Sequence, residues 1–528
     1  MPADTFDAIV IGGGHNGLIS AGYLARAGWK VLVLERRDIV GGACVTEEIF
    51  PGYKVSTAAY VNSLLRPEII EDFDLKRRGY ELLVRNPSSF SPLRDGRHQM
   101  FWADSKKTYD EIAKFSRKDA DRYGEYEAEL ERIATIMEPM LLEPAPDPTS
   151  NKLGDLWRLF RTGMRFRSEL ESIFRLFSMS AADYIERWFE SEPLKARLAT
   201  DGVIGAWAGP RTPGTAYVLF HHVMGQADGQ RGVWGYIRGG MGTITRGLAD
   251  FVTEHGGKII TNADVSLIDV KADRVQKVVL ADGREFKSRV VLSNLDPKRT
   301  FLKLIDPHYL SEKFIRDVEG IRCRSGVVKI NVATHGLPSF SALPGDTAGP
   351  QHRGTIHFTE TMEEIDVAFE EARRGYPSTR PIVEMCIPSV VDETLAPPGK
   401  HFVSLFVQYA PYTRADGQPW TKEHKDAFVK SAFNVISEYA PNWNDIVDDY
   451  LVLTPVDLEE RFGMTGGNIF HGEMTLDQLG FLRPTHSMNR FSTPIDGLYL
   501  CGSGVHPGGG VMGSPGYLAA HHVLRQGR

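Results

Sequence analysis

The chain has 528 residues, of which 42% are hydrophobic and 24% are charged, and its net charge at pH 7 is −7. A chain of this length exceeds what one hydrophobic core organises, so we expect two or three domains. The acidic balance, without any basic block, argues against nucleic acid as a partner.

The four cysteines are scattered along the chain and form no C-x-x-C pair. This spacing gives no support to a disulfide framework, a metal site or a redox-active dithiol, and it favours a reducing compartment. No apolar run is long enough to cross a membrane, and the first strand begins by about residue 6, which leaves no room for a signal or transit peptide. We therefore expect a cytoplasmic protein without a transmembrane helix.

Residues 6 to 36 predict a strand, a glycine turn, a helix and a second strand. The apolar run "FDAIVI" leads into Gly12, Gly14 and Gly17, and the run "KVLVLE" ends at Glu35. The glycines permit a tight turn, a close approach of the backbone to a pyrophosphate, and close packing of the helix on the strand. Glu35 can bind the ribose hydroxyls and disfavours a 2′-phosphate, so NADP is not expected.

Two further glycine clusters bear on the nucleotide. Gly41 and Gly42 follow the second strand, where another turn could approach the pyrophosphate. Simple NAD dehydrogenases do not need this element, so FAD is favoured. Gly508, Gly510 and Gly513 repeat the G-x-G-x-x-G spacing, but only 15 residues follow, with no strand and no acid. We therefore interpret this stretch as the C-terminal return of the FAD domain and not as a second nucleotide site.

Residues from about 105 to 200 are predicted to be helical, with a proline-rich break at 141–150. Within them, residues 156–189 interleave aromatic and basic positions. Two interpretations stay open for this stretch. The favoured one is a cap domain that packs its aromatic side chains inward. The other is a helix that lies on a membrane surface or admits a lipid-like substrate.

Two strand-rich blocks follow, the first with a hairpin at "ADGR", and the last segment is again a buried strand. This order predicts an α/β fold, in which a Rossmann-type FAD-binding domain carries an inserted α+β substrate domain. We expect a discontinuous FAD-binding domain made of residues 1–75, 235–300 and 485–528. Residues 76–234 are expected to form a largely helical cap or substrate region, and residues 301–484 a strand-rich substrate domain.

Six motifs between residues 7 and 516 resemble those of a known family: "DAIVIGGGHNGL", "LERRDIVGGACVTEE", "YIRGGMGTITRGLA", "SNLDP", "GGNIFHGEMTLDQLGFLRP" and "GLYLCGSGVHPGGGVMGSPG". The chain is similar to the phytoene-desaturase-like flavin oxidoreductases, which have the broader amine-oxidase-type FAD fold. "GGNIFHGEM" and "SGVHPGGGV" are the most specific of these motifs.

The resemblance implies that FAD is held from both ends of the chain. It places Val265 near the adenine, and it places Gly502, Val511 and Met512 along the flavin ring. Ala43 departs from the family, because many relatives have an arginine there that contacts phosphate. The candidate FAD-binding residues are Gly12, Gly13, Gly14, His15, Asn16, Gly17, Glu35, Arg36, Gly41, Gly42, Ala43, Val265, Gly502, Ser503, Val511 and Met512.

Flavin chemistry at carbon also needs a group that handles a proton. His471 lies in the glycine-flanked loop "GGNIFHGEM", Glu473 is near enough to orient it or to act itself, and His506 lies in the C-terminal loop. A structural role stays open for each of them. Ser514 is predicted to be the N-cap of the last helix and Pro515 its first residue, so that the positive helix end faces the flavin and favours its reduced, anionic form.

Two further pairs of residues belong either to the hydrophobic core or to a substrate site. His221 and His222 lie among apolar residues and are interpreted as packing residues. Tyr409 and Tyr412 could line a substrate tunnel, although aromatic residues in strands usually belong to the core.

The resemblance implies an FAD-dependent oxidoreductase that transfers hydride to or from flavin at a C–C bond of an apolar small molecule, by desaturation, saturation or isomerisation. The electron acceptor is not identified. Two alternatives stay open: amine-oxidase-type oxidation of a C–N bond, and a flavin-binding regulatory protein with little turnover.

Overall fold

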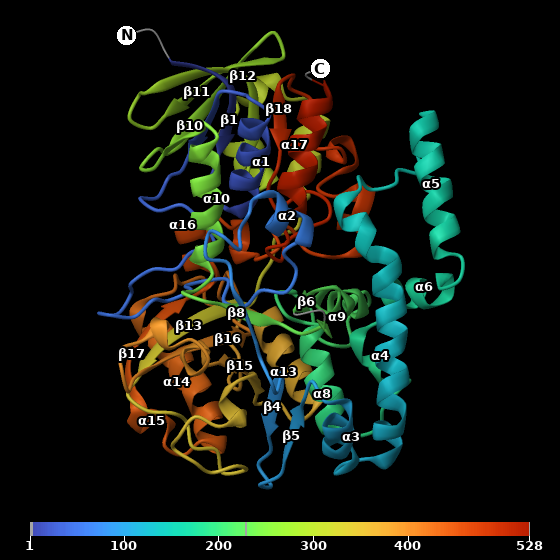
Figure 1. The fold of residues 1–528 in the computed structure, drawn as a ribbon, viewed down its shortest axis with the longest axis vertical. Coiled ribbons are helices and arrows are strands. Elements are labelled where there is room, and N and C mark those ends of the chain that lie inside the picture. Colours follow the sequence, from blue (N-terminus) through green and yellow to red (C-terminus); the bar gives the residue numbers. More distant parts are fainter. Residues whose placement is uncertain (1–3, 228–229, 527–528) are drawn as a thin grey trace.

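Two seven-stranded sheets, two small two-stranded sheets and the helices around them make up the computed structural model, which describes residues 4–227 and 230–526 (Figure 1). The strand order of the first sheet is β10-β11-β12-β1-β2-β9, with β18 beside β12. The order of the second sheet is β17-β13-β16-β15-β14-β4-β5. The small sheets pair β3 (Leu82–Val84) with β8 (Gly235–Ile237), and β6 (Gln226–Ala227) with β7 (Gln230–Arg231).

The first sheet is assembled from three distant stretches of sequence. Its parallel part has β1 at the centre, paired with β2 and β12, while β10, β11 and β12 form an antiparallel meander with a turn at the predicted "ADGR" hairpin. Its strands are β1 (Asp4–Ile11), β2 (Val31–Leu34), β9 (Lys258–Ile260), β10 (Val265–Lys271), β11 (Arg274–Leu280), β12 (Glu285–Ser293) and β18 (Leu498–Leu500).

Helix α1 (His15–Arg26) connects β1 to β2 and forms the predicted βαβ unit. It packs between α10 (Gly242–Glu254) and α17 (Ser514–Gln526), so helices from the start, the middle and the end of the chain cover one face of the sheet (Figure 1). The apolar side chains of β1 and β2 are buried beneath them, as expected for central parallel strands. The predicted domain boundaries stay a prediction.

The second sheet is mostly antiparallel and lies below the first in Figure 1. Its strands are β4 (Ser89–Pro92), β5 (His98–Phe101), β13 (Val327–Thr334), β14 (Thr355–His357), β15 (Ile382–Cys386), β16 (His401–Gln408) and β17 (Val447–Leu453). The helices of this part of the chain are α11 (Pro297–Lys303), α12 (Glu312–Glu319), α13 (Met362–Arg373), α14 (Lys422–Tyr439), α15 (Trp443–Ile446) and α16 (Pro455–Phe462).

A helical layer lies along the right side of both sheets in Figure 1. Tyr126, Leu130 and Ile133 on α4 face the buried side chains of α7, α8 and α9 and form a core of their own. The elements of this layer, with the short helix α2 near the first sheet, are α2 (Pro67–Asp72), α3 (Ser105–Ala113), α4 (Arg117–Met137), η1 (Glu138–Leu142), α5 (Leu153–Phe166), α6 (Leu170–Ser178), α7 (Ala181–Glu186), α8 (Glu192–Asp201) and α9 (Thr215–Val223).

Helices α5 and α6 lie on the outer side of this layer (Figure 1). Trp157, Phe160 and Phe174 are 64%, 58% and 71% exposed. The favoured prediction, that the aromatic residues of 156–189 pack inward, is therefore wrong for these three residues. Phe166 and Phe177 of the same helices do pack against the layer, on the face that also contains Ile173 and Leu176. No described helix is long and apolar enough to cross a membrane. Contact with a membrane surface stays a prediction.

Candidate functional site

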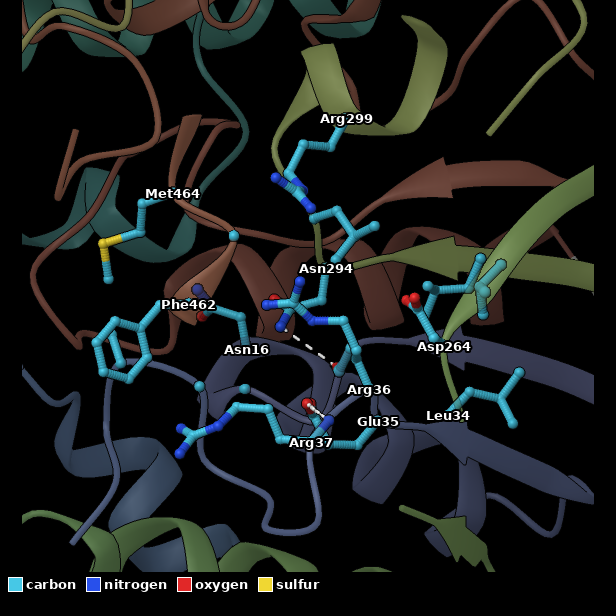
Figure 2. A pocket seen from close by; sticks show the side chains of 18 of the residues that line it. Asn16, Leu34, Glu35, Arg36, Arg37, Asp264, Asn294, Arg299, Phe462 and Met464 are labelled. Atoms are coloured by element: carbon cyan, nitrogen blue, oxygen red, sulfur yellow. Dashed lines mark hydrogen bonds between the residues drawn. The ribbon is translucent and has the colours of Figure 1, made fainter. Parts of the chain in front are cut away.

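A first cavity lies where β1 ends and α1 begins (Figure 2). Gly12 has a φ of +93°, and α1 begins three residues later at His15. A Cβ atom on Gly17 would lie 2.2 Å from Gly12 O, so only glycine allows the helix to approach the strand this closely. The N-terminus of α1, with its free N–H groups, therefore borders the cavity and provides a site for a phosphate.

Glu35 directly follows β2 on the wall of this cavity, with Arg36 and Arg37 beside it (Figure 2). Its Oε2 accepts a hydrogen bond from Gly13 N at 2.7 Å, and its Oε1 accepts one from Arg37 N at 2.9 Å. Burial raises the pKa of Glu35, and these two backbone donors act against that shift. The carboxylate is thereby fixed in orientation on the cavity wall, at the position expected for an acid that binds a ribose.

The second glycine turn packs directly on the first. Gly41 N donates to Gly13 O at 2.9 Å, and a Cβ on Gly42 would lie 3.3 Å from the Cα of Gly14. The two turns thus present adjacent backbone to the same cavity. Ala43, which follows them, lines both the first cavity and a second one behind it.

Other chain segments complete the first cavity with residues that sequence reasoning missed. Asn294, at the end of β12, donates from Nδ2 to Gly12 O at 3.3 Å and fixes the glycine turn. Arg37 and Arg461 line this cavity and both form ion pairs with Glu47. Arg299 lines it from α11 (Figure 2). Because Arg37 and Arg461 share the single carboxylate of Glu47, this wall keeps positive charge that suits a phosphate group and that Ala43 does not provide.

The donor set of this cavity fits FAD. A helix N-terminus and arginines suit the pyrophosphate, and a fixed carboxylate suits a ribose. Of the predicted cofactor residues, those on the cavity wall are Gly12, Gly14, His15, Asn16, Glu35, Arg36, Gly42, Ala43, Val265 and Ser503. Val511 lines the second cavity, whereas Gly13, Gly17, Gly41, Gly502 and Met512 are buried behind the walls. Contact between these residues and FAD stays a prediction.

The two ends of the chain meet at Asn16. Its Nδ2 donates to Ser503 Oγ at 3.1 Å, and its Oδ1 accepts from Gly516 N at 3.4 Å. Ser20, one turn further along α1, donates from Oγ to Gly516 O at 2.8 Å. A Cβ on Gly516 would lie 2.3 Å from Asn16 O, so the N-terminus of α17 can approach α1 only with glycine there.

The start of α17 differs from the prediction. The helix begins at Ser514 itself, and Gly513 O accepts the first helical hydrogen bond from Tyr517 N at 3.1 Å. Gly513, with a φ of +79°, therefore takes the N-cap position, and Pro515 is the second helical residue. The Ser514 hydroxyl has no partner among the described residues. The prediction of a serine cap is wrong, because the positive φ needed at the turn selects glycine.

The second cavity adjoins the first and shares part of its wall. The residues common to both are His15, Ala43, Met464, His471 and Ser503. Next to this shared wall the lining is apolar, with Leu64, Val327, Phe406, Leu458, Ile469 and Phe470. Two residues of the lining, His471 and Val511, both have a φ of +57°. Such backbone is costly outside glycine, above all for a β-branched residue, and is concentrated at functional sites.

His471 lies at the junction of the two cavities, opposite His15. Burial lowers the pKa of His471 and lowers that of His15 to about 4, so both rings are neutral at pH 7. Nδ1 of His471 and Nε2 of His15 have no hydrogen-bond partner among the described residues. These two ring nitrogens are therefore free to bind a group placed at the junction.

The other two candidates for proton transfer lie elsewhere. Glu473 accepts two hydrogen bonds from the Arg324 guanidinium group, at 2.6 and 2.9 Å, one from Arg324 N at 3.3 Å and one from Arg322 at 3.3 Å. His506 Nε2 lies 3.3 Å from Met140 O and 3.2 Å from Glu143 O. Where the structure describes them, neither side chain lines the cavities that contain His471. The geometry therefore does not favour the proton-transfer roles predicted for Glu473 and His506.

Lys329 is a residue of the second cavity that sequence reasoning missed. It lies on β13, whose residues are all buried, and burial lowers the pKa of its ammonium group to about 7. Nζ donates to Ser404 Oγ and to Asn331 Oδ1, the latter at 3.1 Å, and it lies 4.6 Å from the ring centroid of Tyr60. The sequence did contain a signal for this residue, because Lys329 is the only charged residue in the apolar run "SGVVKINVAT".

The structure shows where the pairs His221/His222 and Tyr409/Tyr412 lie. His221 and His222 are buried on α9, where His221 packs against Phe470 and His222 against Trp234, as interpreted from the sequence. Both side chains also line the second cavity, which the sequence did not indicate. Burial lowers the pKa of His221 to about 3, and its Nε2 has no partner among the described residues. Tyr409 is fully buried and donates to Ala208 O at 2.8 Å, whereas Tyr412 is 38% exposed. Within the described residues, neither tyrosine lines the second cavity.

Comparison with known proteins agrees with this geometry. A family model described as flavin containing amine oxidoreductase matches residues 17–514. The pyridine nucleotide-disulfide oxidoreductase domain-containing protein 2 of Rattus norvegicus is 45% identical over 98% of this chain and 93% of its own. A lycopene-forming phytoene desaturase of Pantoea ananas is 26% identical over 97% of both chains. The structure of a putrescine oxidase variant has the same fold, with a TM-score of 0.59 and 15% identity, over 99% of this chain and 100% of that one.

The rat protein's name mentions a disulfide, but the cysteines of this chain do not form one. Cys44, Cys323, Cys386 and Cys501 are all buried and free. Burial raises the pKa of the Cys44 and Cys501 thiols to about 12, which keeps them protonated and unreactive at neutral pH.

Proposed function

Because this chain belongs to the family of flavin-containing amine oxidoreductases, we propose that it transfers a hydride between its FAD cofactor and a C–C bond of a small molecule, by desaturation, saturation or isomerisation. The observation that carries the proposal is the apolar wall of the second cavity. Ile469 and Phe470 lead directly into His471, and Leu64 approaches Gly510 so closely that a Cβ on that glycine would lie 2.6 Å away. An alkyl or alkenyl segment would be held here, next to the FAD cavity.

Bound FAD supplies a ring that exchanges a hydride with carbon. The chain then has to move the proton of the neighbouring carbon. His471 and His15 are neutral and have free ring nitrogens at the junction, so either can accept it. Lys329 is the third group in reach of the cavity, and its pKa of about 7 lets it take up or release a proton near neutral pH. The N-terminus of α17, beside that of α1, favours negative charge at the same end of the site.

Oxidation of a C–N bond is the alternative reaction. Tyr60 and Phe406 line the second cavity with ring centroids 6.4 Å apart, and an aromatic pair of this kind could hold an amine. The Lys329 ammonium group, however, already lies against the Tyr60 ring. A positively charged substrate amine would be repelled there, and this repulsion favours the reaction at carbon. A flavin-binding protein with little turnover is the second alternative.

Anaerobic flavin spectra of the FAD-loaded protein test the proposal in both directions. The oxidised protein is mixed with saturated acyl compounds, polyenes and primary amines, and the chemically reduced protein is mixed with the corresponding alkenes. We expect bleaching by an acyl compound or reoxidation by an alkene. Bleaching by amines alone would replace the proposal with C–N oxidation. No spectral response in either direction, together with no isomerised polyene after incubation with the oxidised or the reduced protein, would favour the regulatory alternative.

A further inference from the structure

The end of the second cavity farthest from the FAD cavity is ionic. It shares Arg85, Ser88, Arg197 and Asp201 with a third cavity, of about 930 Å³, that has no lining residue in common with the first cavity. His357 and Glu384, on β14 and β15, line this ionic end of the second cavity. The proposed reaction at an apolar segment uses none of these groups, so their burial needs another explanation.

Arg85 is a buried guanidinium group without a carboxylate partner. It is 5% exposed, and its hydrogen bonds go to Trp234 O and Thr355 Oγ1, each at 2.6 Å, and to Cys386 Sγ at 3.7 Å. None of these acceptors is a carboxylate, and none of the bonds uses Nη2. Among the described residues, no Asp or Glu oxygen lies within 4.0 Å of Arg85. A buried charge of this kind is strongly unfavourable unless an anion is bound beside it.

The neighbours of Arg85 do not balance its charge. Arg197 and Asp201 form an ion pair with each other at 2.8 Å. Burial raises the pKa of Glu384 to about 8, so its carboxyl group is mostly protonated and neutral at pH 7. Burial holds the pKa of His357 well below its usual range, so that ring is also neutral. The charge of Arg85 is therefore not compensated by these neighbours, and Lys329 of the same cavity adds a further positive charge when it is protonated.

Two of these neighbours also have free polar atoms. Nε2 of His357 has no hydrogen-bond partner in the described part of the chain, and Oε1 of Glu384 is 3.5 Å from His357 Nδ1 without a hydrogen bond to it. Both side chains are more than nine-tenths buried. A ligand with acceptor oxygens would satisfy the protonated Glu384 carboxyl and the Arg85 guanidinium together.

We propose that the ionic end of the second cavity binds a carboxylate of the substrate through Arg85, while the apolar end holds the segment that reacts beside the flavin. The inference rests on the proposed function and narrows its substrate to an amphipathic carboxylic acid. It adds a carboxylate group to the apolar small molecule expected from the sequence. The third cavity, lined by Trp102, Tyr109 and Tyr123, extends from the same arginines and provides room for a larger substrate.

Binding of simple fatty acids to the FAD-loaded protein tests the inference without turnover. Hexanoate, octanoate and decanoate are compared with hexanamide, octanamide and decanamide, by titration calorimetry and by the shift of the flavin absorption bands. We expect at least one carboxylate to bind about 10- to 100-fold more tightly than its amide, as one charge-assisted hydrogen-bond pair implies. Equal affinities across the series, or no binding of any carboxylate, would overturn the inference.

Variants assign the preference to Arg85. Arg85→Met is expected to remove the preference for carboxylate, and Arg85→Lys, which keeps the charge without the fork geometry, to retain part of it. Arg316→Met, on the exposed surface of α12, is the matched control and should leave the preference unchanged. An Arg85→Met protein that holds FAD and keeps the full preference would contradict the assignment. If Arg85→Met loses FAD, the assignment is tested by comparing the preference for carboxylate over amide in the wild type with that in Arg85→Lys.

The two proposals fail separately. Binding is measured without any redox step, so equal affinities for acid and amide leave the hydride-transfer proposal intact. Absence of flavin bleaching by any substrate leaves the carboxylate site intact.

Discussion

Asn16 and Ser503, which are 487 positions apart in sequence, are joined by a hydrogen bond of 3.1 Å from Nδ2 to Oγ. Both residues line the FAD cavity, and Asn16 is 1% exposed. Because Asn16 also accepts a hydrogen bond from Gly516 N, one amide group connects the first helix, the C-terminal loop and the last helix. The cavity is thus closed by a contact between the two ends of the chain.

This contact gives the first prediction. In a double-mutant cycle of Asn16→Ala and Ser503→Ala, we expect a coupling energy of about 1 kcal/mol in the free energy of unfolding, the usual value of one buried hydrogen bond. Asn16→Ala alone should cost more, about 1–3 kcal/mol, because it leaves Gly516 N without its acceptor. Chemical unfolding of the FAD-saturated proteins measures both quantities. If the two single substitutions change the free energy of unfolding in a strictly additive way, the hydrogen bond between Asn16 and Ser503 contributes nothing to stability.

Glu35 is the subject of the second prediction. If its carboxylate binds a ribose of FAD, Glu35→Ala should weaken FAD binding about 10- to 100-fold, since one or two charge-assisted hydrogen bonds are lost. Glu35→Gln should lie between this variant and the wild type. The dissociation constant is measured by quenching of flavin fluorescence on reconstitution of the apoprotein. Glu312→Ala, on α12 and 93% exposed at its side chain, is the control. An unchanged FAD affinity in Glu35→Ala would exclude the ribose contact.

The FAD half of the site was predictable because its signals are local. An apolar strand, closely spaced glycines and an acid at the end of the next strand all lie within residues 6–36, and the structure forms the expected βαβ unit there. The α/β fold, the flavin oxidoreductase family and FAD as cofactor, all expected from the sequence motifs, are confirmed by the family match. The motif order also predicted that the first sheet draws strands from distant stretches.

The substrate half was not predictable, because it depends on contacts between strands and helices that are distant in sequence. Lys329 reaches Ser404 only because β13 pairs with β16, and Arg85 reaches Thr355 and Cys386 across 270 and 301 positions. No local sequence pattern predicts a cluster of polar side chains that comes from strands so far apart in sequence. His221 and His222 have apolar neighbours in sequence, which indicated packing, but sequence could not reveal the cavity beside α9. The pattern of α5 and α6 likewise showed an apolar face without showing that part of it faces solvent.

The third prediction separates two histidines that looked alike in sequence. His471→Asn keeps a residue that tolerates the left-handed backbone but removes the imidazole, so flavin reduction by an active substrate should slow about 100-fold or more. His506→Asn should leave this rate nearly unchanged and lower stability by about 1 kcal/mol, because His506 bonds only backbone oxygens of the helical layer. Anaerobic stopped-flow absorbance and thermal melts give the two readouts. A slow His506→Asn with normal stability would reverse the two roles.

The fourth prediction concerns stability against pH and comes from Lys329. Burial lowers the pKa of Lys329 to about 7 in the folded protein, whereas the unfolded chain keeps a lysine pKa of about 10.4. Between these two pH values the unfolded chain binds more protons than the folded one. The contribution of Lys329 to the free energy of unfolding therefore rises with pH through this window, and the penalty of burying the lysine is largest below it. The buried thiols of Cys44 and Cys501, whose pKa values are raised to about 12, contribute the opposite slope above the pKa of a free thiol, so Lys329 is measured as the difference between the wild type and Lys329→Met.

The titration of Glu384 limits the pH range in which the effect of Lys329 on the free energy of unfolding can be measured. Burial raises the pKa of Glu384 to about 8, so this residue makes stability fall with rising pH below about pH 8 and is silent above it. Between about pH 8 and pH 10 the contribution of Lys329 is then about 3 kcal/mol, at 1.36 kcal/mol per pH unit. We expect Lys329→Met to lose this rise in unfolding free energy, and Lys313→Met, at an exposed position of α12, to keep it. Equal slopes for Lys329→Met and the wild type would mean that Lys329 stays protonated in the folded cavity.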